Sequence, residues 1–347
     1  MIHYFRSFIQ IHTPILTASD CEGAGEVFTV RPASEPSPTP TQRKENQFLY
    51  KNGPTEDKYF GKEVYLTVSG QLHLEAICNG ISRVYNFSPV FRAEHGKSRR
   101  HLSEFWMVEA EVGFAYDTKK DVAILIESLL KHILCSILES NCNEIETFAK
   151  LSQENNLSKH TTDIKLLESI ADINKPFVVL PYDEALDILC KHANQFKSKP
   201  IYGEGLGNEH ELFLVEKHCG NTPVHIIEWP KSIKPFYTRL GDKIDEGSSQ
   251  CYAAAVDTLF PKIGEICGGA LREYRENILL DRMKECDLHN DKNLNSLQWY
   301  INLRRIAGAS PTGGFGLGFD RLIQFILGIN NIRDAMPFPR TPHKCRL

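Results

Sequence analysis

The sequence feature that most constrains the fold is a pair of strand-like stretches that carry charge where a strand normally buries apolar groups. The stretches run from Tyr85 to Glu94 and from Glu104 to Phe114. Their side chains alternate with the period of two that a β-strand requires. In the second stretch this alternation places Glu109 and Glu111 on one face and apolar residues on the other. The sequence therefore predicts a hairpin with carboxylates on one face of a sheet.

The loop between the two strands is strongly basic. It carries Lys97, Arg99 and Arg100, followed by His101, and it has no aspartate. Like charges that crowd a hairpin tip repel one another, so they add nothing to the stability of the fold. Two interpretations remain open from these residues alone. The hairpin is either a solvated element at a sheet edge or a site that binds a polyanion together with a cation.

Net charge limits how such a polyanion can be bound. The chain of 347 residues has a formal net charge of −4, so it has no overall attraction for nucleic acid, and local clusters must supply the binding. Its ten cysteines show no Cys-x-x-Cys pair and no zinc-type spacing with histidine, which predicts reduced thiols in an intracellular compartment. The most apolar stretch, residues 122–138, is interrupted by Glu127, Lys131 and His132, so we expect no membrane span.

The remaining patterns mix helices with strands. Strand-like runs occupy residues 64–69, 224–228, 253–259 and 264–269. Helical periodicity occupies residues 122–138, 182–193, 207–219, 272–283 and 294–307, and Thr118 and Asp121 have capping-box spacing ahead of the first of these. Residues 31–58 are rich in Pro, Ser, Thr and Lys, which predicts a disordered surface insertion. The predicted class is α+β, an antiparallel sheet with helices beside it.

Two further patterns were weighed as cofactor sites. The glycine-rich run 313–321 leads into a predicted helix, but a dinucleotide loop needs a βαβ unit around it and an acid about 20 residues later, and neither is evident. His210 and His218 have helix-like spacing, but no third metal ligand accompanies them. Neither pattern predicts a cofactor by itself.

Three stretches, in this order and at these spacings, resemble the motifs of class II aminoacyl-tRNA synthetases of the aspartyl, asparaginyl and lysyl subgroup. Residues 8–16 resemble the end of motif 1, residues 91–105 resemble motif 2, and residues 314–321 resemble motif 3. Within the subgroup the chain most resembles the asparaginyl-tRNA synthetases of mitochondrial type. The resemblance implies a class II catalytic core over residues 1–347, an antiparallel sheet flanked by helices, and a homodimer.

The resemblance also implies a site for ATP. Arg92 matches the arginine that bridges the amino acid carboxylate and the α-phosphate, and Arg321 matches the catalytic arginine of motif 3. Both are suited to this chemistry, because activation needs positioning and charge stabilisation rather than a general base. The other positions that match ATP contacts are Glu94, Arg100, His101, Phe105 and Glu265. Asp257 and Glu265 match the carboxylates that hold Mg²⁺ on the phosphates.

A second set of positions matches the amino acid pocket of the family. Glu22, Ser69, Gln71 and Glu109 match residues that recognise the α-ammonium group. Arg272 matches the arginine that reaches the side-chain carbonyl, and Glu94 is expected to accept a hydrogen bond from a side-chain amide. Aspartyl relatives carry a lysine where this chain has Leu74. The loss of that cation favours an amide over a second carboxylate, so asparagine, ATP and tRNA(Asn) are the expected substrates.

The chain departs from the family pattern at its start. It begins near the end of the motif 1 helix, and the N-terminal OB-fold that binds the anticodon is absent from it. Three explanations stay open: a shortened form of a longer enzyme, a catalytic-core paralogue that makes asparagine from aspartate, or a non-catalytic partner of the full enzyme. Leu74 argues against the second, and the matched ATP residues argue against the third. The resemblance favours the mitochondrial matrix over the cytoplasm, although no targeting sequence is visible.

Overall fold

The computed structural model describes residues 7–19, 27–33, 59–94, 99–154, 163–241, 251–288, 291–306 and 310–345. Three sequence predictions lie outside these ranges: the role of Glu22, the contribution of Lys97, and nearly all of the insertion at residues 31–58. The rest of the predicted site lies inside them.

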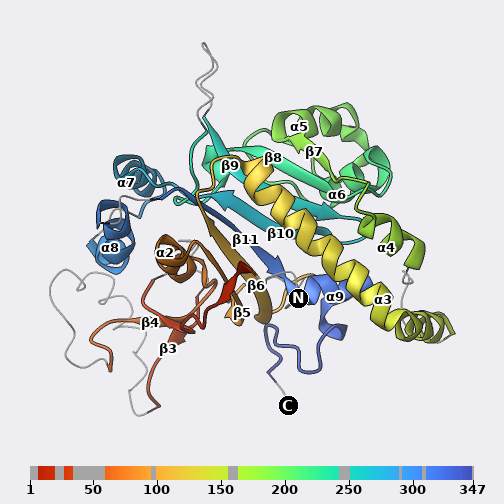
Figure 1. Ribbon diagram of the computed structural model, residues 1–347, viewed down its shortest axis with the longest axis horizontal. Coiled ribbons are helices and arrows are strands. Elements are labelled where there is room, and N and C mark those ends of the chain that lie inside the picture. The colour runs from red at the N-terminus through yellow and green to blue at the C-terminus, as the bar shows by residue number, and fades with distance from the viewer. Residues whose placement is uncertain are drawn as a thin grey trace.

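A mixed sheet of eight strands organises the described part of the chain (Figure 1). Its order is β1 (Ile9–Gln10), β5 (Arg83–Phe91), β6 (Glu104–Gly113), β11 (Thr312–Gly318), β10 (Gly264–Leu271), β9 (Tyr252–Phe260), β8 (Val224–Pro230) and β7 (Val178–Pro181). The central pairs are antiparallel, and only the outermost pairs, β1 with β5 and β7 with β8, are parallel. The prediction of an antiparallel sheet flanked by helices is confirmed.

The predicted hairpin forms, but it does not lie at a sheet edge. Its strands β5 and β6 pair along their length, and β6 also pairs with β11, so the charged strand is central. The solvated-edge interpretation is therefore wrong. The first strand also ends at Phe91, so Arg92 and Glu94 follow it rather than continue it. The Arg92 amide still donates to Ser103 O at 3.0 Å, which keeps the two arms of the loop together.

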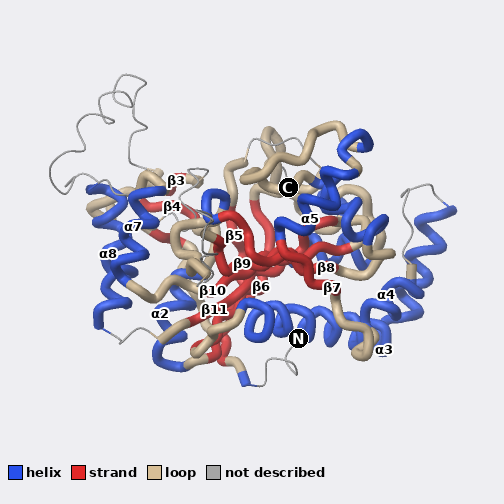
Figure 2. Tube along the Cα trace, turned by 90° about the horizontal axis from the view of Figure 1, so that it is seen from above, coloured by secondary structure: helices blue, strands red, loops and turns tan. Residues whose placement is uncertain are grey.

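The long helix α3 (Ile124–Glu154) lies across one face of the sheet in both views (Figures 1 and 2). Its apolar residues pack against β6 through a shared cluster that includes Leu129, Leu130, Val108 and Ala110. Because side chains alternate along a strand, covering Val108 and Ala110 on this face turns Glu109 and Glu111 to the opposite face. The sheet alternation predicted from the sequence is thus confirmed.

The start of this helical region differs by one residue from the prediction. The N-cap is Asp117, whose carboxylate accepts the amides of Lys119 and Lys120 at 2.9 and 3.0 Å. Asp121 Oδ2 then accepts the amide of Asp117 at 2.9 Å, so the capping side chain is Asp117 rather than Thr118. The π-helical turn η2 (Thr118–Ala123) follows and leads into α3.

The other helices surround the sheet in two groups. Near β7 and β8 lie α4 (Ile164–Ala171), α5 (Tyr182–Lys191), α6 (Asn208–Leu212) and the π-helical turn η4 (Phe213–His218). To the left in Figures 1 and 2, away from β7 and β8, lie α2 (Gln71–Ile81), α7 (Glu276–Glu285) and α8 (Asp291–Ile306), which share an apolar cluster. The helix α9 (Phe319–Ile326) follows β11, and β2 (Leu16–Thr17), β4 (Val64–Leu66) and β3 (Thr29–Val30) form a small second sheet.

One predicted helix begins later than expected. The sequence pattern placed a helix over residues 272–283, but α7 begins at Glu276. Arg272 instead prolongs the sheet, because its amide donates to Thr312 O at 2.8 Å and it bridges to Thr238. The extended backbone there places the Arg272 side chain on the same sheet face as Glu111, where the two side chains pair.

None of the helices within the described ranges has the length and apolar character needed to cross a bilayer.

Candidate active site

A cavity of about 410 Å³ opens on the sheet face opposite α3. Its walls come from the loop between β5 and β6, from β6, β9, β10 and β11, and from the starts of α2 and α9. Every predicted site residue within the described ranges lines it: Ser69, Gln71, Arg92, Glu94, Arg100, His101, Phe105, Glu109, Asp257, Glu265, Arg272 and Arg321. Residues separated by more than half of the chain therefore meet in one place, as the motif resemblance predicted.

Cations and an aromatic ring gather at one end of the cavity. The guanidinium carbon of Arg92 lies 5.6 Å from the centre of the Phe105 ring. Arg321, which follows the first residues of α9, donates through Nη1 to the backbone oxygen of Glu265 at 2.8 Å. Burial lowers the pKa of Arg321, which indicates that its positive charge is only partly compensated here, although the Glu265 carboxylate opposes this shift from 3.9 Å. This end of the cavity is suited to an anion.

Arg100 is positioned by a carboxylate that sequence reasoning missed. Its Nη2 donates to Glu211 Oε2 at 3.2 Å, and the same oxygen accepts the Glu265 amide at 3.0 Å. Glu211 is buried on α6, and burial raises the pKa of its carboxyl group. One side chain thus joins the basic loop to β10. No local pattern marked this residue, because it sits in an ordinary helical segment.

Glu94 and His101 face each other across the base of the loop. His101 Nε2 lies 3.6 Å from Glu94 Oε2, and both side chains are partly exposed. Burial lowers the pKa of His101, and the nearby arginines lower it further, while Glu94 acts in the opposite direction. His101 is therefore a weaker cation than the arginines around it.

Two carboxylates meet above β10 in an arrangement that fits a divalent cation. Asp257 Oδ1 and Glu265 Oε1 lie 3.7 and 3.4 Å from the point that a Cβ atom on Gly268 would occupy. Carboxylate oxygens are the ligands that Mg²⁺ prefers, and it retains water or phosphate oxygens in its other positions. Within the described residues no three His, Cys, Asp or Glu side chains converge on one point, so phosphate oxygens would have to complete such a site.

A lysine that sequence reasoning missed lies against this pair. Lys234 Nζ donates to Asp257 Oδ2 at 2.5 Å and lies 4.0 Å from the centre of the Trp229 ring. Burial raises the pKa of Asp257 to about 6, and the Lys234 charge limits the rise. The sequence offered no signal for this contact, since Lys234 lies just after the 3-10 turn η5 (Lys231–Ile233), outside the strands β8 and β9.

The other end of the cavity is built around Glu109. Its Oε2 accepts the Gly70 amide at 2.8 Å and the Asn86 side-chain amide at 3.2 Å, and its Oε1 accepts the Ser69 hydroxyl. These donors fix the carboxylate at the start of α2, next to Gln71. Ser69, Gln71 and Glu109 are thus brought together as predicted, and Asn86 is a further contact that the prediction missed.

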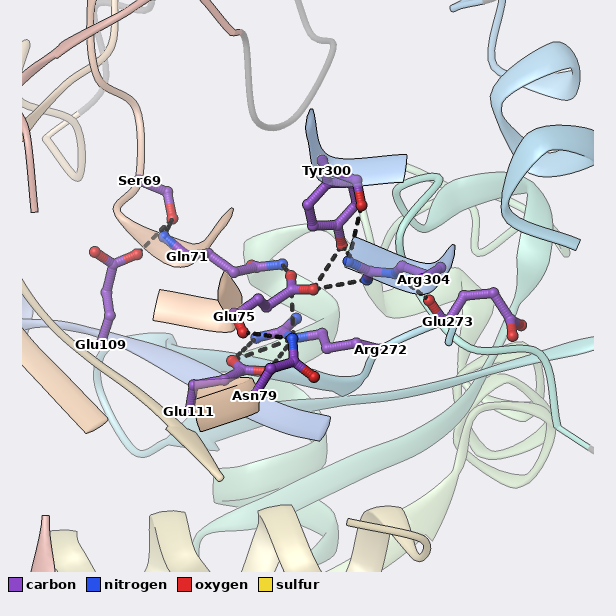
Figure 3. Close-up of polar contacts among 10 residues, drawn as sticks. All are labelled: Ser69, Gln71, Glu75, Asn79, Glu109, Glu111, Arg272, Glu273, Tyr300 and Arg304. Atoms are coloured by element: carbon purple, nitrogen blue, oxygen red, sulfur yellow. Dashed lines mark hydrogen bonds and ion pairs between the residues drawn. The ribbon is translucent and has the colours of Figure 1, made fainter. Parts of the chain in front are cut away.

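Arg272 pairs with Glu111, a carboxylate to which the sequence prediction gave no role. Its Nε lies 3.1 Å from Glu111 Oε1 and its Nη2 lies 3.0 Å from Glu111 Oε2 (Figure 3). Both side chains are at most 5% exposed. Burial raises the pKa of Glu111 to about 7, and the Arg272 charge opposes this rise. The sequence signal for Glu111 existed, namely a carboxylate at an inward position of a central strand, but no role was attached to it.

The glycine-rich strand β11 makes room for this pair. A Cβ atom at Gly314 would collide with the Glu111 carboxylate, and one at Gly316 would collide with the end of Met107. Only a glycine at position 314 leaves space for the Glu111 carboxylate, which lies directly over this residue on the sheet face. The run therefore serves close packing in a sheet rather than a dinucleotide loop.

The remaining histidine pattern is structural. His210 is buried, its Nδ1 accepts the Gly207 amide at 3.2 Å, and its Nε2 lies 2.9 Å from Ser198 O. Both ring nitrogens are engaged in holding the start of α6, so this side chain is not a metal ligand.

Known proteins match the chain over nearly its whole length. Residues 2–342 match the family described as "tRNA synthetases class II (D, K and N)". The chain is 40% identical over 349 residues to an asparaginyl-tRNA synthetase of Homo sapiens, which covers 100% of this chain and 65% of that relative. It is 43% identical over 345 residues to an asparagine–tRNA ligase of Nitratidesulfovibrio vulgaris (strain DP4), which covers 98% of this chain and 68% of that relative. The chain thus spans about two thirds of the length of these relatives.

A solved structure gives the same result. The asparaginyl-tRNA synthetase from Pyrococcus horikoshii complexed with asparaginyl-adenylate has a TM-score of 0.76 at 31% identity and covers 99% of this chain and 67% of that one. An asparaginyl-tRNA synthetase of Entamoeba histolytica, at 24% identity and a TM-score of 0.74, shares the fold. The chain belongs to the class II tRNA synthetases of the D, K and N family. Within that family, the resemblance to asparaginyl-tRNA synthetases predicted from the three motifs is confirmed.

Proposed function

We propose that this chain activates asparagine with ATP, which gives asparaginyl-adenylate and pyrophosphate, and transfers the asparaginyl group to tRNA(Asn) with release of AMP. The observation that carries the proposal is the division of one cavity into a cationic end and a buried arginine–carboxylate end. The first end suits a triphosphate and the second suits a neutral amide. The relatives named above, and the adenylate in the P. horikoshii complex, support the same reading.

The first step needs positioning and charge stabilisation. The asparagine carboxylate is the nucleophile, it attacks the α-phosphorus, and the bond to pyrophosphate breaks. We assign Arg92 to hold the carboxylate and an α-phosphate oxygen together, because its planar fork donates to two oxygens at once. Arg321 stabilises charge from the opposite side, and Arg100 with His101 binds the distal phosphates. The Phe105 ring stacks on adenine, a contact worth about 1–3 kcal/mol.

We propose that Asp257 and Glu265 hold Mg²⁺ on the phosphates. When bound, the ion supplies positive charge to the phosphate oxygens and helps pyrophosphate to leave. Lys234 Nζ lies 2.5 Å from Asp257 Oδ2, so this lysine compensates the charge of the largely buried Asp257 carboxylate. Glu94, beside His101, lies at the ATP end of the cavity.

The amino acid end supports asparagine over aspartate. Ser69, Gln71 and Glu109 receive the α-ammonium group, and Glu22 is proposed to join them from outside the described ranges. Arg272 donates to the side-chain carbonyl. The role expected of Glu94, accepting from the amide NH₂, is better placed at Glu111, because Glu111 is the carboxylate that lies beside Arg272.

The test is ATP–pyrophosphate exchange by the purified chain. We expect asparagine to support exchange far better than aspartate, since hydrogen-bonded sites discriminate by large factors. Faster exchange with aspartate contradicts the assignment and favours the asparagine-making paralogue. Exchange with neither amino acid favours the non-catalytic partner.

Transfer to tRNA is a separate part of the proposal and has its own test. Charging of tRNA(Asn) transcripts with labelled asparagine is compared with the exchange rate of the same preparation. We expect charging, because every predicted site residue except Glu22, which lies outside the described ranges, lines one cavity. Exchange without charging limits the function of this chain to activation.

We also propose a homodimer and a location in the mitochondrial matrix. The dimer is supported by the short parallel edge strand β1, where Ile9 is 51% exposed beside β5. Light scattering during gel filtration measures the mass, and a monomeric mass contradicts the dimer. Location rests on the motif resemblance alone, and microscopy of the tagged gene product tests it against the cytoplasm.

A further inference from the structure

Behind the amino acid end of the cavity, a buried cluster of charges joins α2 to α8 (Figure 3). Its centre is Glu75, which is 1% exposed. Glu75 Oε1 accepts from Gln71 Nε2 at 3.0 Å and lies 3.9 Å from Arg272 Nε. Glu75 Oε2 accepts from the Tyr300 hydroxyl at 2.7 Å and from Arg304 Nη2 at 2.8 Å. One carboxylate thus links two cavity residues to two residues that lie outside the cavity.

The α8 side of this cluster is held firmly. The Arg304 guanidinium lies 3.9 Å from the centre of the Tyr300 ring, and its Nε donates to Glu273 O at 3.0 Å. Glu273 itself is paired with Arg275 at 2.8 Å, so it adds no net charge. Apolar residues from α2, α7 and α8 pack around the cluster: Leu72, Leu279, Leu297 and Ile301. The contact between Glu75 and Arg304 spans 229 residues of sequence.

The charges behind the pocket sum to zero. Arg272 and Arg304 carry two positive charges and, above pH 7, Glu75 and Glu111 carry two negative charges, all on side chains that are at most 5% exposed. An uncompensated charge at such a position is strongly unfavourable, by several kcal/mol. An asparagine side chain adds no charge to the group, whereas an aspartate side chain adds a carboxylate that nothing balances. Charge balance therefore favours the amide.

We propose that Glu75, supported by Tyr300 and Arg304, is a positioning residue that sets the preference for asparagine over aspartate without touching the substrate. It acts through Arg272, whose charge it shares with Glu111. It also acts through Gln71, because the Gln71 amide NH₂ donates to Glu75 and leaves the amide oxygen to accept from the substrate ammonium. The inference deepens the proposed function and rests on it.

The experiment compares kcat/KM for asparagine and for aspartate in ATP–pyrophosphate exchange by the whole chain. Glu75→Gln keeps the shape and removes one negative charge, so the cluster gains a net positive charge. We expect the asparagine-to-aspartate ratio to fall by at least about tenfold, mainly through a lower KM for aspartate. Glu75→Asp keeps the charge and loosens the geometry. It is expected to keep the wild-type ratio even where its kcat falls.

Two further variants separate charge from structure. The double variant Glu75→Gln with Arg304→Gln is neutral again, so its ratio should return to within about threefold of wild type. Tyr300→Phe removes one donor to the Glu75 carboxylate and leaves the ring in place, so the ratio should fall in the same direction by about two- to threefold. The control is Arg305→Gln on the same helix, where Arg305 is 51% exposed and pairs with Glu276 at 2.6 Å. This control should keep both constants.

Each result decides the question. A ratio that is unchanged in both Glu75→Gln and Tyr300→Phe overturns the inference, and so does an equal loss of both activities with no change in the ratio. If Glu75→Gln does not fold, as judged by circular dichroism, Tyr300→Phe carries the test. A wild-type chain that exchanges with asparagine leaves the proposed function standing whichever way the variants behave. A wild-type chain that exchanges with neither amino acid refutes the proposed function, and this inference with it.

Discussion

The charged side chains at the two ends of the cavity differ in their exposure to solvent and in how they are paired. At the ATP end the charged side chains stay in partial contact with solvent: Arg100 is 25% exposed, Arg321 is 22% exposed and Glu265 is 40% exposed. At the amino acid end Arg272, Glu75 and Glu111 are at most 5% exposed and are paired with one another. The difference fits the proposed ligands. A triphosphate brings charges that partly solvated cations can bind, whereas a neutral amide must be recognised by groups that are already balanced.

Exposure also predicts how each end responds to mutation. Partly solvated charges are screened and contribute little to stability, so their loss should appear in catalysis. Buried pairs hold the fold together when intact and destabilise it when one member is removed. Variants at the two ends should therefore separate activity from stability.

The largest effect is expected from Arg92→Ala at the ATP end. Loss of a group that stabilises charge in the transition state costs about 10²–10³ in rate, and Arg92 is assigned to two oxygens, so asparagine-dependent exchange should fall by at least that factor. The melting temperature should stay near that of wild type. Exposed Arg83 on β5 provides the matched control, Arg83→Ala, with unchanged exchange. Exchange within tenfold of wild type in Arg92→Ala contradicts its catalytic role.

The second effect should separate the ends by stability. Arg272→Gln removes the cation of the buried pair with Glu111, and such losses destabilise proteins by about 3–5 kcal/mol, an upper range here because glutamine keeps a hydrogen bond. Glu265→Gln removes a carboxylate that is 40% exposed, so its unfolding free energy should stay close to wild type. Urea denaturation measures both. An equal loss of unfolding free energy in the two variants would show that exposure does not determine how much a charge at either end contributes to stability.

The third effect concerns substrate choice at the buried end. Leu74 lines the cavity and is 0% exposed, so Leu74→Lys places a new cation beside the amide site. We expect the asparagine-to-aspartate ratio in pyrophosphate exchange to fall by about tenfold or more, since each 1.4 kcal/mol changes an equilibrium tenfold. Leu74→Met, which keeps an uncharged side chain of similar volume, is the control. A ratio that Leu74→Lys leaves unchanged would remove charge balance as the basis of selectivity at this end.

The smallest effect is a pH dependence at the ATP end. Burial raises the pKa of Asp257 to about 6, above its ordinary value of 3.8. The folded state therefore binds this proton more tightly than the unfolded state, and the resulting stability is present below pH 3.8 and is lost as the pH rises through about 6. In magnesium-free buffer, the melting temperature of Asp257→Asn should rise relative to wild type across that interval. Parallel curves for the two proteins contradict a raised pKa.

Local sequence patterns predicted part of the site, because alternating side chains along a strand show which residues share a face. The alternation in residues 104–114 placed Glu109 and Glu111 opposite the apolar residues that α3 covers, and the structure confirms this. Motif resemblance then identified the cavity residues on five separate elements. Boundaries were less secure, as the start of α7 shows. There the periodicity suggested a helix from residue 272, but the Arg272 amide is committed to the sheet by its bond to Thr312.

The pairing of charges could not be anticipated from periodicity. Glu111 and Arg272 are 161 residues apart, and Glu75 and Arg304 are 229 residues apart. Lys234 meets Asp257 because the segment after β8 returns alongside β9, where the Ala254 amide donates to Arg239 O. No local rule connects such positions, since their distance depends on how strands order in the sheet and on how α8 packs against α2.

By itself the sequence determined the two faces of β6, because they follow from the alternation of side chains along the strand. Its three motifs determined the family and, through that resemblance, most of the site residues that line the cavity. Only the tertiary structure decided which carboxylate compensates which arginine and which of them are buried. The reason is physical: the energy of a charge depends on its exposure and on its neighbours in space. The proposed preference for an amide at the buried end therefore rests on the assembled core rather than on any one motif.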